Sequence, residues 1–172
     1  MTISEALAYF DEDREVARVL TPLADVGLEY VKLGQPVPTL SGGEAQRLKL
    51  AGFLAEAASG KPPTRGTLYL FDEPTTGLHF DDVARLMRAF RKLLAAGHSL
   101  VIIEHNMDVV SASDWLIDLG PEGGDGGGEV VATDTPDDLI RHERSHTGRE
   151  LKAYRAALAH RIAVDAFERH VR

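Results

Sequence analysis

Two adjacent carboxylates follow an apolar run that is typical of a buried strand. Residues 68–71 read LYLF, and Asp72 and Glu73 come directly after them. Carboxylates are costly to bury unless they are paired or bind a metal ion, and at the carboxyl end of a parallel strand they face the crevice where ligands bind. There the first acid can hold Mg²⁺ and the second can orient or deprotonate a water molecule. The alternative is a strand that ends in a solvated acidic turn.

A pair of glycines at the expected start of a helix forms a second candidate site. Ser41 and Glu44 flank Gly42 and Gly43 with the spacing of a capping box. Glycine lets the backbone approach a ligand closely, and the free N–H groups and dipole of a helix N-terminus favour an anion such as phosphate. A capped helix start without a ligand is the alternative.

A histidine follows the next apolar run, residues 99–103, which also predicts a buried strand. His105 stands two positions after that run. An imidazole at the carboxyl end of a strand can donate a hydrogen bond to a phosphate oxygen, although an isolated histidine at such a place is more often a turn residue. The order of the three features along the chain favours a single nucleotide site.

These residues resemble the motifs of ATP-binding-cassette (ABC) ATPases. Residues 40–44 resemble the signature motif and residues 68–72 the Walker B strand. Glu73 matches the catalytic glutamate of that family, residues 76–79 lie where its D-loop lies, and His105 matches its switch histidine.

Longer runs narrow the resemblance to the C-terminal cassette of the UvrA family, the damage-recognition subunits of bacterial nucleotide excision repair. These runs are residues 39–51, 72–79, 103–108 and 118–128. The resemblance extends from residue 1 to about residue 154, and residues 155–172 form an unassigned helical tail.

The resemblance implies a composite site for ATP and Mg²⁺. Asp72 would coordinate the ion, Glu73 would activate water and His105 would contact the γ-phosphate. The residues that would close over nucleotide held by a partner's phosphate loop are Ser41, Gly42, Gly43 and Glu44. The implied partners are a second copy or a fuller UvrA-like chain, damaged DNA in the assembled complex and a UvrB-like protein.

The phosphate loop of this family, G-x-x-x-x-G-K-[ST], does not occur in the chain. The Gly60-Lys61 pair is followed by proline, and the glycine-rich run at 123–128 holds no lysine. Because that lysine makes charge-assisted hydrogen bonds to phosphate, we expect the chain to be inactive alone and to bind ATP weakly. We interpret the sequence as a cassette truncated before its signature, which should expose a sheet edge and an apolar sheet face.

The elements that position these residues indicate an α/β fold, part of a P-loop NTPase fold with a mainly parallel sheet flanked by helices. Apolar runs predict strands at residues 67–71, 99–103, 115–119 and 129–133. Helical spacing predicts helices in residues 4–33 with an interruption at Pro22, after Ser41, from residue 81, at 136–141 and at 147–170. We divide the chain into residues 1–40, a helical segment, 41–154, the cassette part, and 155–172, the tail.

Two further side-chain groups have ordinary interpretations. Arg47 and Lys49 could touch phosphates, but charges on a helix surface are more often solvated. The stripe Leu151, Tyr154, Leu158 and Ile162 predicts core packing.

Composition limits the possible functions. The 172 residues suffice for one domain, and 19 basic against 27 acidic residues give a net charge of −8, a poor basis for gripping nucleic acid alone. The absence of cysteine excludes a thiolate zinc site. Neither a membrane span nor a secretory leader is evident, so we expect a cytoplasmic protein without a membrane partner. Two alternatives remain: an inactive interaction module that binds a fuller homologue, and the ATPase subunit of a transporter.

Overall fold

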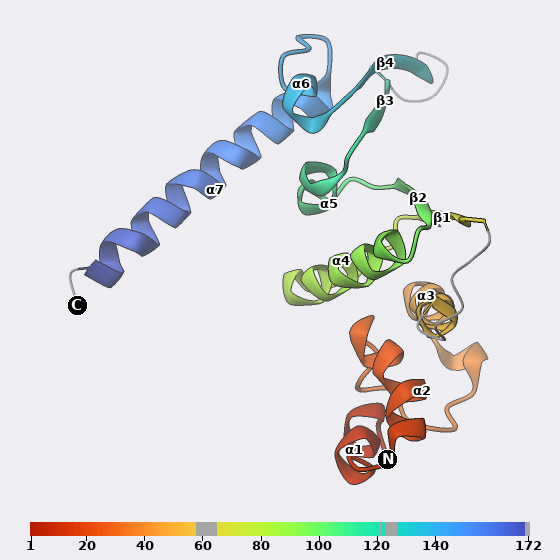
Figure 1. The fold of residues 1–172 in the computed structure, drawn as a ribbon. Helices are drawn as coiled ribbons and strands as arrows, with labels where there is room; N and C mark the ends of the chain where they lie inside the picture. Colours follow the sequence, from red (N-terminus) through yellow and green to blue (C-terminus); the bar gives the residue numbers. More distant parts are fainter. Residues whose placement is uncertain (58–64, 121, 123–126, 171–172) are drawn as a thin grey trace. The chain divides into compact units, whose positions relative to one another are not determined.

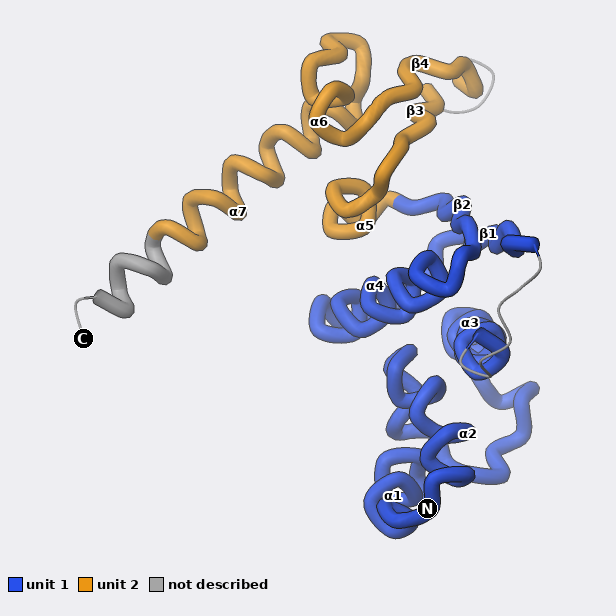
Figure 2. Tube along the Cα trace, viewed as in Figure 1, with its two compact units in different colours: residues 1–104 blue, residues 105–172 orange. Residues whose placement is uncertain are grey.

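The structure is a computed structural model that describes residues 1–57, 65–120, 122 and 127–170 (Figure 1). It divides into two compact units, Met1–Glu104 and His105–Arg172, which are described separately (Figure 2). The predicted loops at residues 60–66 and 120–128 lie largely outside the described residues. The division at residues 40 and 154 stays a prediction.

The first unit begins with four helical elements. They are α1 (Ile3–Tyr9), α2 (Arg14–Asp25), the 3₁₀ helix η1 (Val37–Thr39) and α3 (Gly42–Ala57). Thr2 and Asp13 cap α1 and α2 by accepting backbone N–H bonds. The expected interruption at Pro22 is wrong, because Pro22 lies inside α2 and is buried. A proline removes one intrahelical bond, and the burial of its apolar ring offsets part of that loss.

A strand–helix–strand unit completes this half of the chain. Strand β1 (Leu68–Asp72), helix α4 (Phe80–Ala95) and strand β2 (Ser99–Ile103) follow in order, and the strands pair in parallel with Leu68 opposite Ser99. The prediction of parallel pairing across a helix is confirmed for these strands. Gly97 ends α4 with φ of 88°, a conformation that glycine adopts without strain.

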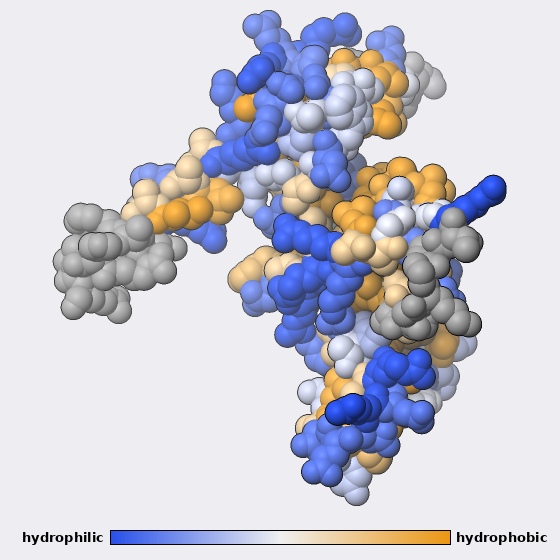
Figure 3. Space-filling view, viewed as in Figure 1, coloured by the Kyte–Doolittle hydropathy of each residue, from blue (hydrophilic) through white to orange (hydrophobic). Residues whose placement is uncertain are grey.

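Within the described residues, the strand pair is covered on one face only. Phe71 belongs to the core of α3 and α4, and Tyr69, Leu100 and Ile102 pack against that core. The side chains on the opposite face are exposed, and they are Leu68, Leu70, Val101 and Ile103. Hydrophobic colour gathers at the surface over β1 and β2 in Figure 3. The prediction of buried strands is therefore wrong for this face, whereas the prediction of an exposed apolar sheet face is confirmed.

The second unit pairs its two strands in the opposite sense. It contains α5 (Met107–Ala112), β3 (Leu116–Gly120), β4 (Glu129–Asp134), α6 (Pro136–Leu139) and α7 (His146–His170). Strands β3 and β4 are antiparallel, with a register shift between Asp118 and Leu119. The link at residues 121–128 is shorter than the crossover of about a dozen residues that parallel strands need. The described strands thus form two pairs, of which one is parallel.

A buried polar network holds the start of α7. Ser145 is fully buried and donates to Asp118 Oδ2 at 2.6 Å, and Thr147 donates to Asp118 Oδ1 at 2.7 Å. The backbone N–H of Gly148 donates to Ser145 Oγ at 2.7 Å. Both oxygens of the Asp118 carboxylate accept a hydroxyl hydrogen, so the network ties β3 to α7 and leaves neither oxygen without a hydrogen-bond donor.

Where its side chains are described, as far as residue 163, helix α7 packs through its first turns only. Leu151 is fully buried and Tyr154 is half-buried, but Leu158 and Ile162 are exposed. The predicted core stripe is therefore right for its first half and wrong for its second. None of the helices in the described ranges has the length and apolar character that a membrane span requires.

Candidate functional site

The N-terminus of α3 carries the capping box expected from the sequence. The backbone N–H of Ser41 donates to Glu44 Oε2 at 2.6 Å, and the N–H of Glu44 donates to Ser41 Oγ at 3.3 Å. Ser41 and Gly42 are exposed. Because Ser41 Oγ accepts in this arrangement, its own hydrogen stays able to donate to an anion.

Tyr30 fixes the other oxygen of the same carboxylate. Its hydroxyl donates to Glu44 Oε1 at 2.5 Å. This hydrogen bond, followed by those from Ser41, lowers the pKa of Glu44 below its usual value. Partial burial, followed by the hydrogen bond to Glu44, raises the pKa of Tyr30. The first turn of α3 is therefore held by a charged carboxylate and a neutral phenol.

We expect Tyr30→Phe to raise the pKa of Glu44 and to lower the free energy of unfolding near neutral pH by about 1 kcal/mol. A carboxyl group with a lowered folded-state pKa contributes stability above its unfolded pKa and loses it as the pH falls through the folded-state value. The variant should therefore lose less stability than the wild type between about pH 5 and pH 3.

Urea unfolding across that pH range, with an NMR titration of the Glu44 carboxyl, measures both effects. Tyr9→Phe is the matched control, since Tyr9 is 72% exposed. Equal titration of Glu44 in wild type and Tyr30→Phe would show that the phenol does not hold this carboxylate.

Arg47 lies behind this turn rather than in solvent. Only 6% of the residue is exposed, and within the described residues its Nε has no hydrogen-bond partner. The prediction of a solvated Arg47 is therefore wrong. The reason is that Arg47 shares the inward face of α3 with Leu50, Ala51 and Leu54, which pack into the core.

Gly43 brings the turn after β1 against the start of α3. A Cβ atom at Gly43 would stand 3.3 Å from the Thr76 carbonyl oxygen and 3.6 Å from Arg47 Nη1. The 3.3 Å separation from the Thr76 oxygen is tighter than an ordinary van der Waals contact, so the lack of a side chain at Gly43 permits the close approach. The residues that resemble the signature motif and those that resemble the D-loop consequently lie side by side.

The two carboxylates at the end of β1 are both exposed. The Gln46 side chain donates to the Asp72 backbone oxygen at 2.9 Å, which ties α3 to the end of the strand. Glu73 has a φ of 43°, and its N–H donates to the Ile103 oxygen at 2.9 Å. Thr76 Oγ1 donates to Glu73 Oε2 at 3.2 Å. A non-glycine residue in the left-handed region stores backbone strain, which clusters at functional sites.

Glu104 supports the turn that follows β1, and the sequence analysis did not predict this role. Its Oε1 accepts the Thr75 backbone N–H at 2.8 Å. Its place one residue before His105, after an apolar strand, repeats the acidic strand-end pattern of β1 and is a signal that could have found it. Tyr30 and Gln46 carried no such signal, because their partners are distant in sequence.

His105 opens the second unit, whereas Asp72 and Glu73 belong to the first. His105 is exposed and follows β2 after one intervening residue. All the predicted site residues except His105 thus belong to the first unit.

The exposed carboxylate of Asp72 suits one ligand position of a magnesium ion. In the described part of the chain, no group of three or more His, Asp or Glu residues could hold a metal ion by itself. Mg²⁺ is commonly held by one or two carboxylates together with substrate phosphates and water. Asp72 therefore fits an ion that arrives with a nucleotide.

Comparison with known proteins finds close relatives. No protein-family model matches the chain. UvrABC system protein A of Aquifex aeolicus is 52% identical over 154 residues, which is 90% of this chain and 16% of that protein. The protein of the same name from Thermus thermophilus is 58% identical over 139 residues, or 81% of this chain and 14% of that protein. The chain thus spans about one sixth of the length of these relatives.

Solved structures agree with this similarity. The crystal structure of UvrA2 from Deinococcus radiodurans matches with a TM-score of 0.79 and 45% identity, covering 89% of this chain and 18% of that one. A bacterial Atm1-family ABC exporter with ATP bound matches with a TM-score of 0.53 at 23% identity, over 90% of this chain and 26% of that one, which shows the fold alone. The fold is therefore α/β and forms part of an ABC ATPase fold.

Proposed function

Over 90% of its length this chain is similar to one segment of the UvrA proteins, and from that premise we propose that it supplies the signature and Walker B parts of a UvrA-like ATPase. The ATP site is composite, and a second polypeptide, either another copy or a fuller UvrA-like chain, holds the triphosphate. The assembled complex acts on damaged DNA in the cytoplasm, with a UvrB-like protein as a further partner.

The observation that carries this proposal is the contact between the start of α3 and the turn after β1. Within the described residues, the N–H groups of Gly42 and Gly43 have no partner, and Ser41 and Gly42 are exposed. The first N–H groups of a helix and its dipole together favour a phosphate. Gly43 approaches Thr76 closely, and this supports the proposal that a partner's nucleotide touches both loops.

We propose the roles of the side chains from their resemblance to the motifs of ABC ATPases. Ser41 Oγ–H and the N–H groups of Gly42 and Gly43 donate to phosphate oxygens. Asp72 holds the magnesium ion that neutralises charge on the phosphates. Glu73 orients and deprotonates the attacking water, and His105 donates to the γ-phosphate.

Mixing the chain with a full-length UvrA-like protein tests the proposal. We expect the two to form a complex that is retained with a non-hydrolysable ATP analogue and released with ADP, together with a changed ATPase rate and changed DNA retention. Ser41→Ala should weaken the complex about tenfold, because it removes one hydroxyl donor to a charged oxygen. Ser4→Ala, an exposed serine on α1, is the matched control. The proposal fails if the wild-type chain changes none of these readouts.

A second candidate function rests on the exposed apolar face of β1 and β2. A protein that covers Leu68, Leu70, Val101 and Ile103 would bind this chain as an inactive interaction module. Glu73→Gln separates the two functions, since it keeps the side-chain shape and removes the base. An unchanged effect of this variant on a partner's ATPase rate favours the interaction module, and a lost effect favours a catalytic contribution.

A further inference from the structure

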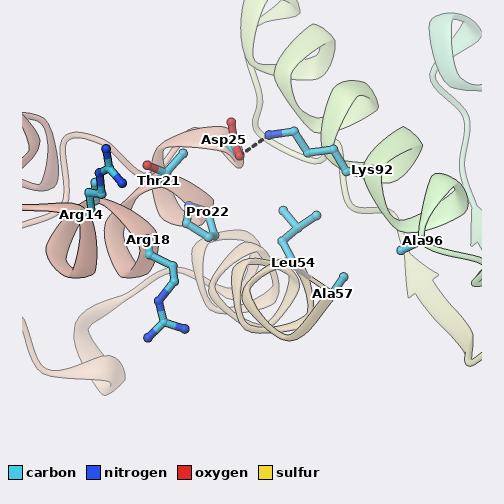
Figure 4. A pocket seen from close by; sticks show the side chains of 10 residues that line it. Arg14, Arg18, Thr21, Pro22, Asp25, Leu54, Ala57, Lys92 and Ala96 are labelled. Carbon is cyan, nitrogen blue, oxygen red and sulfur yellow. Dashed lines mark hydrogen bonds and ion pairs between the residues drawn. The ribbon is translucent and has the colours of Figure 1, made fainter. Parts of the chain in front are cut away.

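A groove in the first unit lies between α2, α3 and α4. It has a volume of about 520 Å³. Its apolar floor comes from Pro22, Leu54, Ala57 and Ala96 (Figure 4). Along α3, Leu54 lies roughly 18 Å from Gly42, so the groove is remote from the candidate nucleotide surface.

Two of the three basic side chains on the rim of the groove lack an acidic partner within the described residues. Arg14 and Arg18 extend from α2 and are exposed, and in the described part of the chain neither makes an ion pair. Lys92, by contrast, is paired with Asp25 at 2.5 Å (Figure 4). Arg14 also lies in the first turn of α2, where the helix dipole disfavours a cation. An incoming acidic group would therefore relieve repulsion as well as add attraction.

The complementary feature lies on the same unit, at the turn between α1 and α2. Tyr9 is 72% exposed and Phe10 is 38% exposed, and their rings contact edge to face with centroids 4.8 Å apart. Asp11 and Glu12 follow directly and are also exposed. The Asp13 carboxylate, by contrast, already accepts backbone hydrogen bonds as the cap of α2. This turn thus presents two aromatic rings beside two acidic side chains.

We propose that a second copy of this chain docks in the groove, with the Tyr9–Glu12 turn of each copy placed against the groove of the other. The aromatic rings cover the apolar floor, and Asp11 and Glu12 meet Arg14 and Arg18. Because the turn immediately precedes α2 and the groove runs along α2, two antiparallel α2 helices about a twofold axis satisfy both contacts at once. Nucleic acid fits this groove less well, because phosphate groups bind polar and cationic groups and make no favourable contact with an apolar floor.

A charge-swap experiment with the full chain tests the proposal. Sedimentation velocity of the wild type should show a monomer–dimer equilibrium that weakens as sodium chloride is raised, because solvent-accessible charge pairs are screened by salt. One variant, Arg14→Glu with Arg18→Glu, makes the groove and the turn both acidic. The other, Asp11→Lys with Glu12→Lys, makes both basic. Each variant alone should dimerise at least about tenfold more weakly, and a one-to-one mixture should form a heterodimer.

The controls separate this interface from other causes of association. Arg144→Glu with Lys152→Glu reverses two exposed charges in the second unit and should leave the dimer unchanged. Neutral variants, Arg14→Gln with Arg18→Gln, give the same direction of effect if a reversed-charge chain fails to fold, as judged by circular dichroism. A monomeric wild type at millimolar concentration overturns the proposal. Dimers that strengthen with salt, or a mixture that does not associate, also overturn it, and salt-strengthened dimers point to the apolar face of β1 and β2. The outcome is independent of the proposed ATP site, because no nucleotide is present.

Discussion

Calorimetric titration of the isolated chain with Mg²⁺-ATP should reveal no dissociation constant below about 1 mM. The residues that resemble the signature motif offer two backbone N–H groups and one hydroxyl, and Asp72 offers a single carboxylate. The sequence contains no G-x-x-x-x-G-K-[ST] loop, so the lysine and the nest of N–H groups that cradle a triphosphate are not supplied by this chain.

A full-length UvrA-like protein titrated under the same conditions is the positive control, and it should bind ATP at least about a hundredfold more tightly. Micromolar binding by the isolated chain at neutral pH would mean that a phosphate cradle exists here without the expected motif. Such a result would contradict the composite site and would indicate that this chain binds ATP by itself, near Asp72 and Glu73.

Replacing Gly148 with alanine should lower the free energy of unfolding of the second unit by about 3 kcal/mol. A Cβ atom at this position would stand 2.3 Å from the Leu139 carbonyl oxygen and 3.1 Å from Ser145 Oγ. Since a backbone oxygen cannot swing aside, α7 must shift and break the 2.7 Å bond from Gly148 N–H to Ser145 Oγ. That shift also disturbs the buried hydroxyl that satisfies Asp118.

Urea unfolding followed by the fluorescence of Trp115, the single tryptophan, reports on this unit. Gly52→Ala, which lies in the first unit and is therefore followed by circular dichroism, is the control, because a Cβ atom there meets nothing within 4 Å and alanine is the better helix former. The control should be neutral or stabilising. An unfolding midpoint for Gly148→Ala that equals that of the wild type would show that the Leu139 backbone can yield.

Much of the local structure was predictable because it depends on nearby residues. The capping box at Ser41 and Glu44 is confirmed, as is the helix end at Gly97. The four strands also lie within one or two residues of their predicted positions. Hydrophobic spacing, caps and glycine act over a few residues, so sequence patterns report them directly.

The direction of strand pairing and the burial of individual side chains were harder to predict from the sequence. Helical spacing places Arg47 on the same face as Leu50 and Leu54, so the error came from taking its charge as a sign of exposure. The burial of Pro22 depends on tertiary packing around α2. The sequence already shows that the link between β3 and β4 is too short for a parallel crossover. The wrong prediction of parallel pairing for these strands came from applying the parallel rule to every strand.

The amino-acid sequence alone was enough to place Asp72 and Glu73 after one strand, His105 after the next, and the glycine pair at a helix start, because these are relations between neighbours along the chain. Tertiary structure alone revealed that Tyr30 holds Glu44, that Gln46 reaches Asp72, and that Gly43 lies against Thr76. Each of these contacts joins residues at least fourteen positions apart. The packing of α3 against β1 decides which distant groups meet, and no local pattern encodes that packing.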